Sequence, residues 1–99
     1  MARIFFAPEV LEDFDRFFDH VAAADPSDAA DRVADIVEAV QVLASSPLIG
    51  RPVRDGKGEL VVGRAARGYV LLYRFVPVAD AVFVLAARNQ REAGYKRKV

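Results

Sequence analysis

Two stripes of apolar residues at helical spacing fill the first half of the chain, and they constrain its fold more than any other feature. The first follows Pro8 and consists of Val10, Leu11, Phe14, Phe17, Phe18 and Val21. The second follows Asp25-Pro26, an N-cap residue with a proline at the first helical position, and consists of Val33, Ile36, Val37, Val40, Leu43 and Ala44. Because only residues 22–25 separate them, the stripes predict an antiparallel helical hairpin with one face sealed into a core. The acidic residues of the first helix and Arg16 are expected on its other, exposed face.

Short runs with strand character flank this hairpin. Residues 3–6 predict a first strand, and residues 59–62, 69–76 and 81–88 predict three more, joined by turns at 63–68 and 77–80. Residues 48–58 are rich in Gly and Pro without either periodicity, so they are expected to form an ordered loop. The expected fold is α+β in the order β-α-α-β-β-β, a twisted antiparallel sheet with the helical hairpin packed on one face. The 99 residues suffice for one core, so a single domain is expected over 1–99.

The strand expected over 69–76 is apolar on both faces. Residues 69, 71, 73 and 75 form one face, whereas Val70, Leu72 and Val76 form the other, which only Arg74 interrupts. In the last strand, residues 82, 84 and 86 are expected to share a face. Two helices cover only one side of such a sheet, so the other is expected to be partly open and to bind a protein or a second copy. An alternative stays open, in which the 48–58 loop and the C-terminal tail cover that side.

Composition excludes several kinds of chemistry. The chain has no Cys, which rules out a disulfide framework, a thiolate metal site and a cysteine nucleophile. Its one histidine, His20, falls on the acidic first helix without a metal-ligand partner, so a structural role and no cofactor are expected. The apolar runs at residues 3–6 and 69–75 are too short for a signal peptide or a membrane span, so a cytoplasmic location without membrane contact is expected.

The charge is strongly divided along the chain. Residues 1–50 hold three Lys or Arg against ten Asp or Glu, whereas residues 51–99 hold eleven against four. The basic half predicts an anionic partner. Its site candidates follow the expected strands and their turns: Arg64, Arg67, Arg74, Arg88, Arg91 and Tyr95. In a meander these residues lie on or beside one sheet surface, where guanidinium groups bind phosphates or carboxylates and a tyrosine ring stacks.

Two further parts of the basic half are open to more than one interpretation. Arg74 interrupts an apolar strand, which is costly unless it pairs with a helix acid or belongs to the site. Lys96, Arg97 and Lys98 are expected mainly to keep the protein soluble. For residues 90–99 a helix, a docked tail and a disordered end all stay open, although Gly94 disfavours a continuous helix.

Four motifs occur in order after the helices: SPLIGRP at 46–52, EL at 59–60, GYVLLYR at 68–74 and RNQREAGY at 88–95. Together with the preceding strand and helical hairpin, they resemble the RelE/ParE superfamily, toxins of type II toxin–antitoxin modules often labelled plasmid stabilisation proteins. The resemblance implies the α+β fold described above. It also implies a hetero-oligomer with a cognate antitoxin, whose acidic, partly disordered segment folds on the toxin. Such a segment would account for both an open apolar sheet face and a basic second half.

The family divides by mechanism. RelE-like members cleave messenger RNA in the ribosome with Lys, Arg and Tyr, whereas ParE-like members inhibit DNA gyrase and need no catalytic centre. Arg91 and Tyr95 match the nuclease pattern and are the catalytic candidates if the chain is a nuclease. However, Val61 and Gly63 stand in place of the basic pair on the second strand, and Val70 stands in place of an arginine. The resemblance therefore favours the ParE-like members.

Three functions follow as hypotheses. The favoured one is a toxin that inhibits growth by binding a target, with DNA gyrase the leading candidate. The second is a ribosome-dependent endoribonuclease that uses Arg91, Tyr95 and one of Arg64 and Arg74. The third is a non-catalytic interaction domain or a decayed toxin. In the first two, antitoxin and target contacts are expected to overlap at the basic site candidates.

Overall fold

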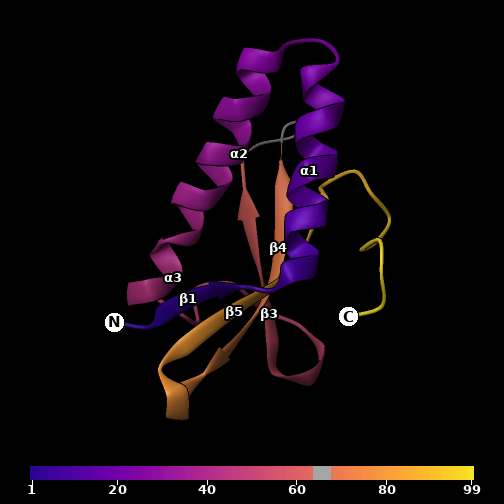
Figure 1. The fold of residues 1–99 in the computed structure, drawn as a ribbon. Helices are drawn as coiled ribbons and strands as arrows, with labels where there is room; N and C mark the ends of the chain where they lie inside the picture. Colours follow the sequence, from indigo (N-terminus) through magenta and orange to yellow (C-terminus); the bar gives the residue numbers. More distant parts are fainter. Residues whose placement is uncertain (64–67) are drawn as a thin grey trace.

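A computed structural model describes residues 1–63 and 68–99. Strand β1 (Arg3–Phe6) leads into α1 (Pro8–Ala22), α2 (Pro26–Val40) returns alongside it, and a short α3 (Val42–Ser45) follows (Figure 1). Each long helix begins with a proline, whose missing N–H costs nothing in the first turn. The Asp25 carboxylate accepts hydrogen bonds from the N–H groups of Ser27 and Asp28 at 3.1 and 3.3 Å. The predicted hairpin is confirmed, together with its start signals.

The sheet has the strand order β1-β5-β4-β3-β2. The predicted antiparallel meander is confirmed in β3 (Lys57–Val62), β4 (Tyr69–Val76) and β5 (Ala81–Asn89). However, β1 pairs with β5 in parallel, from Arg3 opposite Ala81 to Phe6 opposite Val84, so the sheet is mixed rather than wholly antiparallel. No turn joins these two strands, and the local pattern of the sequence carries no information about their relative direction.

The expectation of a loop over residues 48–58 is wrong in part. This segment contains β2 (Arg51–Pro52) and a 3-10 turn (Arg54–Gly56), and β3 begins at Lys57, two residues earlier than predicted. The Val53 N–H donates to the Lys57 carbonyl at 2.9 Å and closes a hairpin, in which Gly56 has a φ of 72°. A two-residue strand shows no periodicity, and its proline is tolerated because β2 forms an edge of the sheet.

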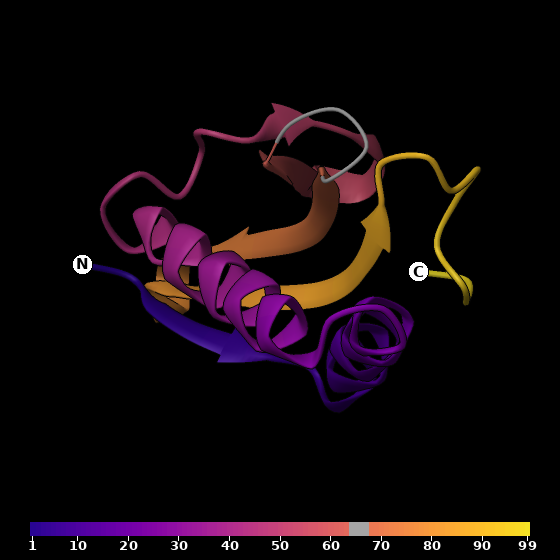
Figure 2. The same cartoon turned by 90° about the horizontal axis from the view of Figure 1, so that it is seen from above.

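The helical hairpin lies on one side of the strongly curved sheet (Figure 2). Val10, Phe14 and Phe17 of α1 pack with Ile36 and Val40 of α2 against the inner strand residues Tyr69, Leu71, Tyr73, Val82 and Val84. Each fully buried side chain of this size stabilises the fold by roughly 1.5–3 kcal/mol. No described helix is long and apolar enough to cross a membrane.

Helix α1 is rotated relative to the expected apolar stripe. Leu11 and Phe18 are 52% and 39% exposed, whereas Asp13, expected on the exposed face, is 1% exposed. On a helix, position 13 lies beside positions 10 and 17, on the opposite side of the stripe from 11 and 18. Rotation of α1 about its axis toward Asp13 therefore explains both the exposure of Leu11 and Phe18 and the burial of Asp13. The contacts that Asp13 makes, described below, account for this rotation.

Strand β5 contains a bulge at Leu85. Tyr73 pairs with Val84 and Leu72 with Ala86, so Leu85 has no partner in β4. The inward and outward alternation reverses at this point, and Ala86 lies on the side away from the helices rather than with Val82 and Val84 as expected. The bulge coincides with the end of β1, because Phe6 is paired opposite Val84. Beyond it, the outer edge of β5 has no neighbouring strand among residues 1–63 and 68–99.

Candidate functional site

The side of the sheet away from the helices, here called the open face, is strongly cationic. The pairing register brings five basic residues to it, one from each strand: Arg3, Arg51, Lys57, Arg74 and Arg88. Lys57 and Arg74 are directly opposite one another in adjacent strands, an arrangement of like charges that destabilises a sheet. On the described strands of this face, Glu59 is the single acid. Such an excess of positive charge suits an anionic partner.

Glu59 is the centre of a polar cluster on the open face. The Tyr95 hydroxyl donates to Glu59 Oε2 at 2.7 Å, and Arg51 donates to Oε1. The Arg88 guanidinium lies 5.5 Å from the centre of the Tyr95 ring. Burial opposes ionisation of Glu59, but the hydrogen bonds from Tyr95 and Arg51 outweigh it and lower the pKa of that carboxyl. Burial and the adjacent Glu59 carboxylate raise the pKa of Tyr95, so this residue is held as a neutral phenol.

The Tyr95 cluster covers the middle of the open face. Glu59, Leu72 and Ala86 are neighbours across three strands, and the Tyr95 hydroxyl contacts Glu59 at one end of this row, while Arg88 of the same face lies over the Tyr95 ring. Leu72 and Ala86 are accordingly 4% and 0% exposed. The exposed apolar residues of this face are found away from the row, with Phe5 and Phe83 stacked at 5.4 Å and Val61 on β3. The expected open apolar face and the expected cover by the tail are therefore each present in part.

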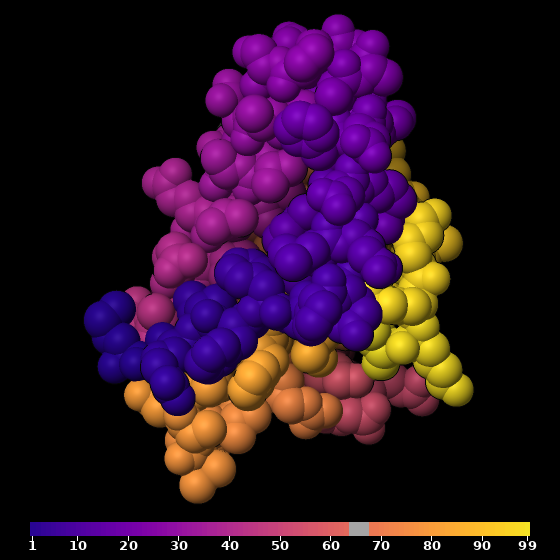
Figure 3. All heavy atoms as spheres, viewed as in Figure 1, coloured from indigo at the N-terminus to yellow at the C-terminus, as the bar shows by residue number. Residues whose placement is uncertain are grey.

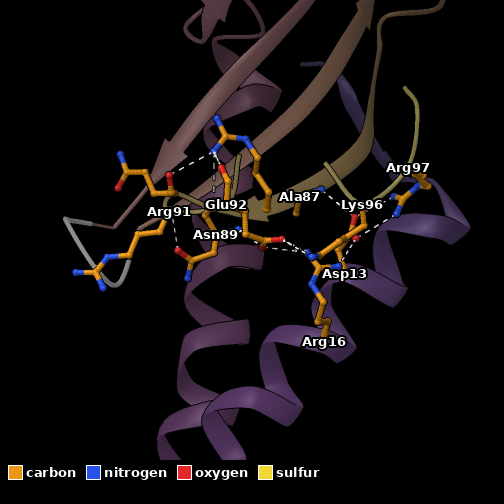
Figure 4. A network of polar contacts seen from close by, with 10 residues as sticks. Asp13, Arg16, Ala87, Asn89, Arg91, Glu92, Lys96 and Arg97 are labelled. Carbon is orange, nitrogen blue, oxygen red and sulfur yellow. Dashed lines mark hydrogen bonds and ion pairs between the residues drawn. The ribbon is translucent and has the colours of Figure 1, made fainter. Parts of the chain in front are cut away.

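The segment after β5 is a docked tail anchored on Asp13. Arg97 donates to both Asp13 oxygens at 3.1 and 2.9 Å, Arg16 donates to Oδ1 at 2.9 Å, and the Ala87 N–H donates to Oδ2 at 2.9 Å (Figure 4). Burial alone would raise the pKa of Asp13, but hydrogen bonds from Arg97, Ala87 and Arg16 hold it below its ordinary value. The expected role of Arg97 in solubility is wrong, because this side chain is partly buried in an ion pair. In Figure 3 the tail lies against α1.

The tail also completes the edge of the sheet. Beyond the end of β1, the Leu85 carbonyl accepts a hydrogen bond from Arg97 at 3.0 Å, and the Ala87 N–H is taken by Asp13. These two side chains thus replace the missing strand beside the bulge. The hydrogen bonds from its partners keep Asp13 ionised. Its contact with the Ala87 N–H explains why this carboxylate is buried.

A tight turn follows β5 and fixes the position of Arg91. Asn89 Oδ1 accepts from the Arg91 N–H at 2.9 Å, and the Asn89 N–H donates to the Glu92 carboxylate at 2.8 Å. The Glu92 N–H donates to the Asn89 carbonyl at 3.0 Å, and Arg88 Nη1 donates to the Glu92 carbonyl at 3.1 Å. The RNQRE motif at 88–92 is therefore a side-chain-stabilised turn, and Arg91 projects from it with an exposed side chain.

The predicted site residues do not form one group. Arg74, Arg88 and Tyr95 belong to the open face, whereas Arg91 lines a cavity on the helix side of the sheet with Tyr69 and residues of α1 and α2. Arg64 and Arg67 lie outside the described residues. The predicted alternative of a salt bridge between Arg74 and a helix acid is wrong, because Arg74 is on the face opposite the helices and no described carboxylate is within ion-pair distance.

Sequence reasoning missed the residues that hold the tail, Asp13 and Glu59 above all. A signal for Asp13 was present, since it is adjacent on the helix to the apolar positions 10 and 17. Glu59 gave a weaker signal as the one acid among the basic residues of the sheet. Within residues 1–63 and 68–99, no group of three His, Asp or Glu side chains is arranged to hold a metal ion.

The same fold occurs in solved toxin structures. The chain resembles one from the chromosomal ParDE TA system of P. aeruginosa, with a TM-score of 0.76, 24% identity and coverage of 90% of this chain and 96% of that one. It resembles a chain of the intact E. coli RelBE toxin–antitoxin complex with a TM-score of 0.65, 15% identity and coverage of 93% and 100%. The isolated E. coli RelE toxin gives a TM-score of 0.65, 12% identity and coverage of 94% and 88%. At these identities the likeness concerns the fold.

Comparison of the sequence with known protein families identifies the family of this chain. No curated protein sequence matches this chain. Residues 4–94 match the family described as the ParE toxin of type II toxin–antitoxin systems, parDE, which is nearly the whole chain. The ParE-like assignment inferred from the missing basic residues is thereby confirmed. This chain belongs to the family of ParE toxins of type II toxin–antitoxin systems.

Proposed function

We propose that the chain is a toxin that inhibits growth by binding a protein target, with DNA gyrase the leading candidate, and that an acidic segment of a cognate antitoxin neutralises it. The observation that carries this proposal is the separation of Arg91 from Tyr95. The former lines a cavity on the helix side of the sheet, and the latter is engaged with Glu59 on the open face. The two residues with which a nuclease would act are therefore not directed at one reacting phosphate.

The chemistry of Tyr95 also argues against the nuclease. Cleavage of RNA by its own 2′-hydroxyl needs a base for that hydroxyl, cations for the phosphate and an acid for the leaving oxygen. The Tyr95 hydroxyl already donates to Glu59, and burial beside that carboxylate raises its pKa, which disfavours the ionised form that a base requires. Its proton is directed at a carboxylate of the protein itself rather than toward a vacant position.

The open face has the properties of a protein-binding surface. It combines the five cations with the exposed aromatic pair Phe5 and Phe83, which are 40% and 36% exposed. Protein interfaces use such aromatic and arginine side chains as anchors. An acidic antitoxin segment complements the same charges, so antitoxin and target would compete for one surface.

Supercoiling by purified gyrase tests the target. Wild-type toxin in excess is expected to inhibit it, and equimolar antitoxin to restore it; full supercoiling at excess toxin would remove gyrase as the target. Arg74→Glu reverses a charge on the open face and is expected to weaken inhibition at least tenfold. Lys98→Glu makes the same charge change at the exposed end of the tail and serves as the matched control.

Expression of the toxin alone distinguishes the remaining functions. Growth arrest is expected, with transcripts intact when their ends are mapped in ribosomes. Arg91→Ala is expected to leave growth arrest largely unchanged, because Arg91 lies on the helix side of the sheet, whereas loss of toxicity together with loss of ribosomal cleavage would establish the nuclease instead. A folded product that arrests nothing would indicate a decayed toxin. The adjacent open reading frame is expected to encode a small DNA-binding protein with an acidic tail.

A further inference from the structure

The cavity beside Arg91 has the size and lining of a small-molecule site. It measures about 440 Å³ and lies between α1, α2, the inner side of β4 and the turn at 89–92. Ligand sites of small molecules typically fall between roughly 300 and 1,000 Å³. Tyr69 and Asn89 contribute polar groups to its wall. The open face contributes none of its lining, so this cavity is separate from the surface proposed to bind gyrase.

The lining carries a marked excess of positive charge. Arg16, Arg32, Arg91 and Lys96 face the cavity together with one acid, Glu92. Glu92 is already neutralised, because Arg16 and Lys96 are within 3.1 and 3.4 Å of its oxygens. Arg16 also pairs with Asp13, and Arg32 pairs with Asp28, so Arg91 is the lining cation without an ion-pair partner among the described residues, and an anion in the cavity would supply one.

Hydrogen bonds hold the side chains of Arg16 and Arg32 and the backbone of Arg91 in place. Arg16 is held between Asp13 and Glu92, and Arg32 donates to Asp28 at 3.0 Å. Arg91 projects from the hydrogen-bonded turn, and Figure 4 shows its side chain extending away from the Asp13 cluster. No described acid forms an ion pair with Arg91. A guanidinium group such as that of Arg91 can bind phosphate with two parallel hydrogen bonds.

A second, smaller cavity adjoins the first and has the opposite character. It measures about 260 Å³, shares Arg32 and Tyr69 with its neighbour, and is lined by Asp28 and Asp35. Carboxylates accept hydrogen bonds from hydroxyl and amino groups. The two cavities together thus offer a cationic end for an anion and an acidic end for hydrogen-bond donors. A simple anion would contact only the cationic end.

We propose that the paired cavities bind a nucleotide, with its terminal phosphate at Arg16, Arg91 and Lys96 and its sugar hydroxyl or base amino groups toward Asp28 and Asp35. A nucleotide carries a phosphate and donors on one small molecule, which matches both ends. The phosphate belongs either to a free mononucleotide or to the 5′ end of a nucleic-acid strand. This inference goes beyond the proposed function and does not depend on it, because the cavity and the open face share no residue.

Calorimetric titration of the purified chain tests the proposal, with AMP, GMP, adenosine, inorganic phosphate and a short oligonucleotide with or without a 5′ phosphate as probes. The nucleotides are expected to bind more tightly than inorganic phosphate, and adenosine not to bind. A preference for the 5′-phosphorylated strand over AMP identifies a strand end as the ligand, and the reverse identifies a free nucleotide. Absence of binding by AMP, GMP and the phosphorylated strand at millimolar concentration would overturn the proposal.

Matched variants separate a site from general charge attraction. Arg91→Ala is expected to weaken nucleotide binding about tenfold or more. Arg74→Ala removes the same charge from the opposite side of the sheet and is expected to leave it unchanged; equal losses would show unspecific attraction. Asp35→Asn is expected to weaken AMP binding but not phosphate binding. Failure of these binding tests would leave gyrase inhibition untouched, and failure of gyrase inhibition would leave them untouched.

Discussion

Arg97 donates two hydrogen bonds, of 3.1 and 2.9 Å, to the carboxylate of Asp13, which is 1% exposed. This contact joins the tail to the first helix and completes an edge of the sheet. Asp13 also holds Arg16, which in turn binds Glu92, so the same acid fixes the beginning of the tail. The tail is therefore part of the folded structure, and its ionic contacts determine how the domain responds to mutation and to acid.

Asp13→Asn is expected to destabilise the domain strongly. The variant keeps the size of the side chain but leaves the guanidinium groups of Arg97 and Arg16 without a charged partner, and loss of one member of a buried pair costs about 3 kcal/mol. Urea denaturation measures the free energy of unfolding. Asp15→Asn removes the same charge from an exposed position of α1 and is expected to change stability by less than about 0.5 kcal/mol. Equal stabilities for the two variants would contradict the anchoring role of Asp13.

The free energy of unfolding is expected to decrease in acid, although the formal net charge of the chain is zero. The pKa values of Asp13, Glu59 and Glu92 are all lowered from ordinary values of 3.8 and 4.5. A lowered pKa in the folded state means that the stabilisation is fully present above about pH 5 and is lost as the pH falls through about 4 and below. Unfolding free energies measured between pH 7 and 3 should decrease accordingly. The slope should be smaller in Asp13→Asn, and an equal slope would exclude Asp13 as a major contributor.

Gly50→Ala is expected to destabilise the return from the helices to the sheet. A Cβ at this position would lie 2.6 Å from the Tyr73 hydroxyl oxygen and 2.7 Å from the Glu59 carbonyl, and the Gly50 N–H donates to that hydroxyl at 3.0 Å. Because part of the obstacle is backbone, the overpacking should cost about 1–3 kcal/mol. Gly94→Ala is the control, since its Cβ would meet no atom within 4 Å. Thermal unfolding of both variants checks the difference.

Asp25→Ala is expected to weaken the start of α2. The substitution leaves the N–H groups of Ser27 and Asp28 without their acceptor and should lower stability by about 1 kcal/mol. Asp31→Ala, within the same helix, is expected to leave stability unchanged or to raise it slightly, since alanine favours helix interiors. Chemical denaturation distinguishes the two, and a loss of similar size in both would argue against a capping role.

Local chemistry made most of the fold predictable. Pro8 and Asp25-Pro26 mark helix starts by the hydrogen bonds that they lack or supply, and the bounds of β4 follow from its apolar run. The short strand at Arg51 and the bulge at Leu85 were not predictable, because each depends on hydrogen bonds to a neighbouring strand rather than on side-chain period. The parallel direction of β1 relative to β5 was not predictable from the sequence for the same reason.

The site was less predictable than the fold. The register placed Arg74 and Arg88 on one surface, as a meander requires, but the tail could not be placed from its own composition. Lys96 and Arg97 look like a solubilising basic end until the acids that they meet, Glu92 and Asp13, are brought near by folding. Long-range ion pairs leave no local pattern in a sequence, so the separation of Arg91 from Tyr95 became visible only in three dimensions.

The pairing of β1 with β5 has a consequence for folding during synthesis of the chain. Residue 3 lies beside residue 81, and residue 97 beside residue 13, so these contacts of the first strand and the first helix require residues that are synthesised much later. Such distant contacts form late and slowly. A nascent chain in which residues 81 and 97 have not yet left the ribosome therefore lacks the finished sheet.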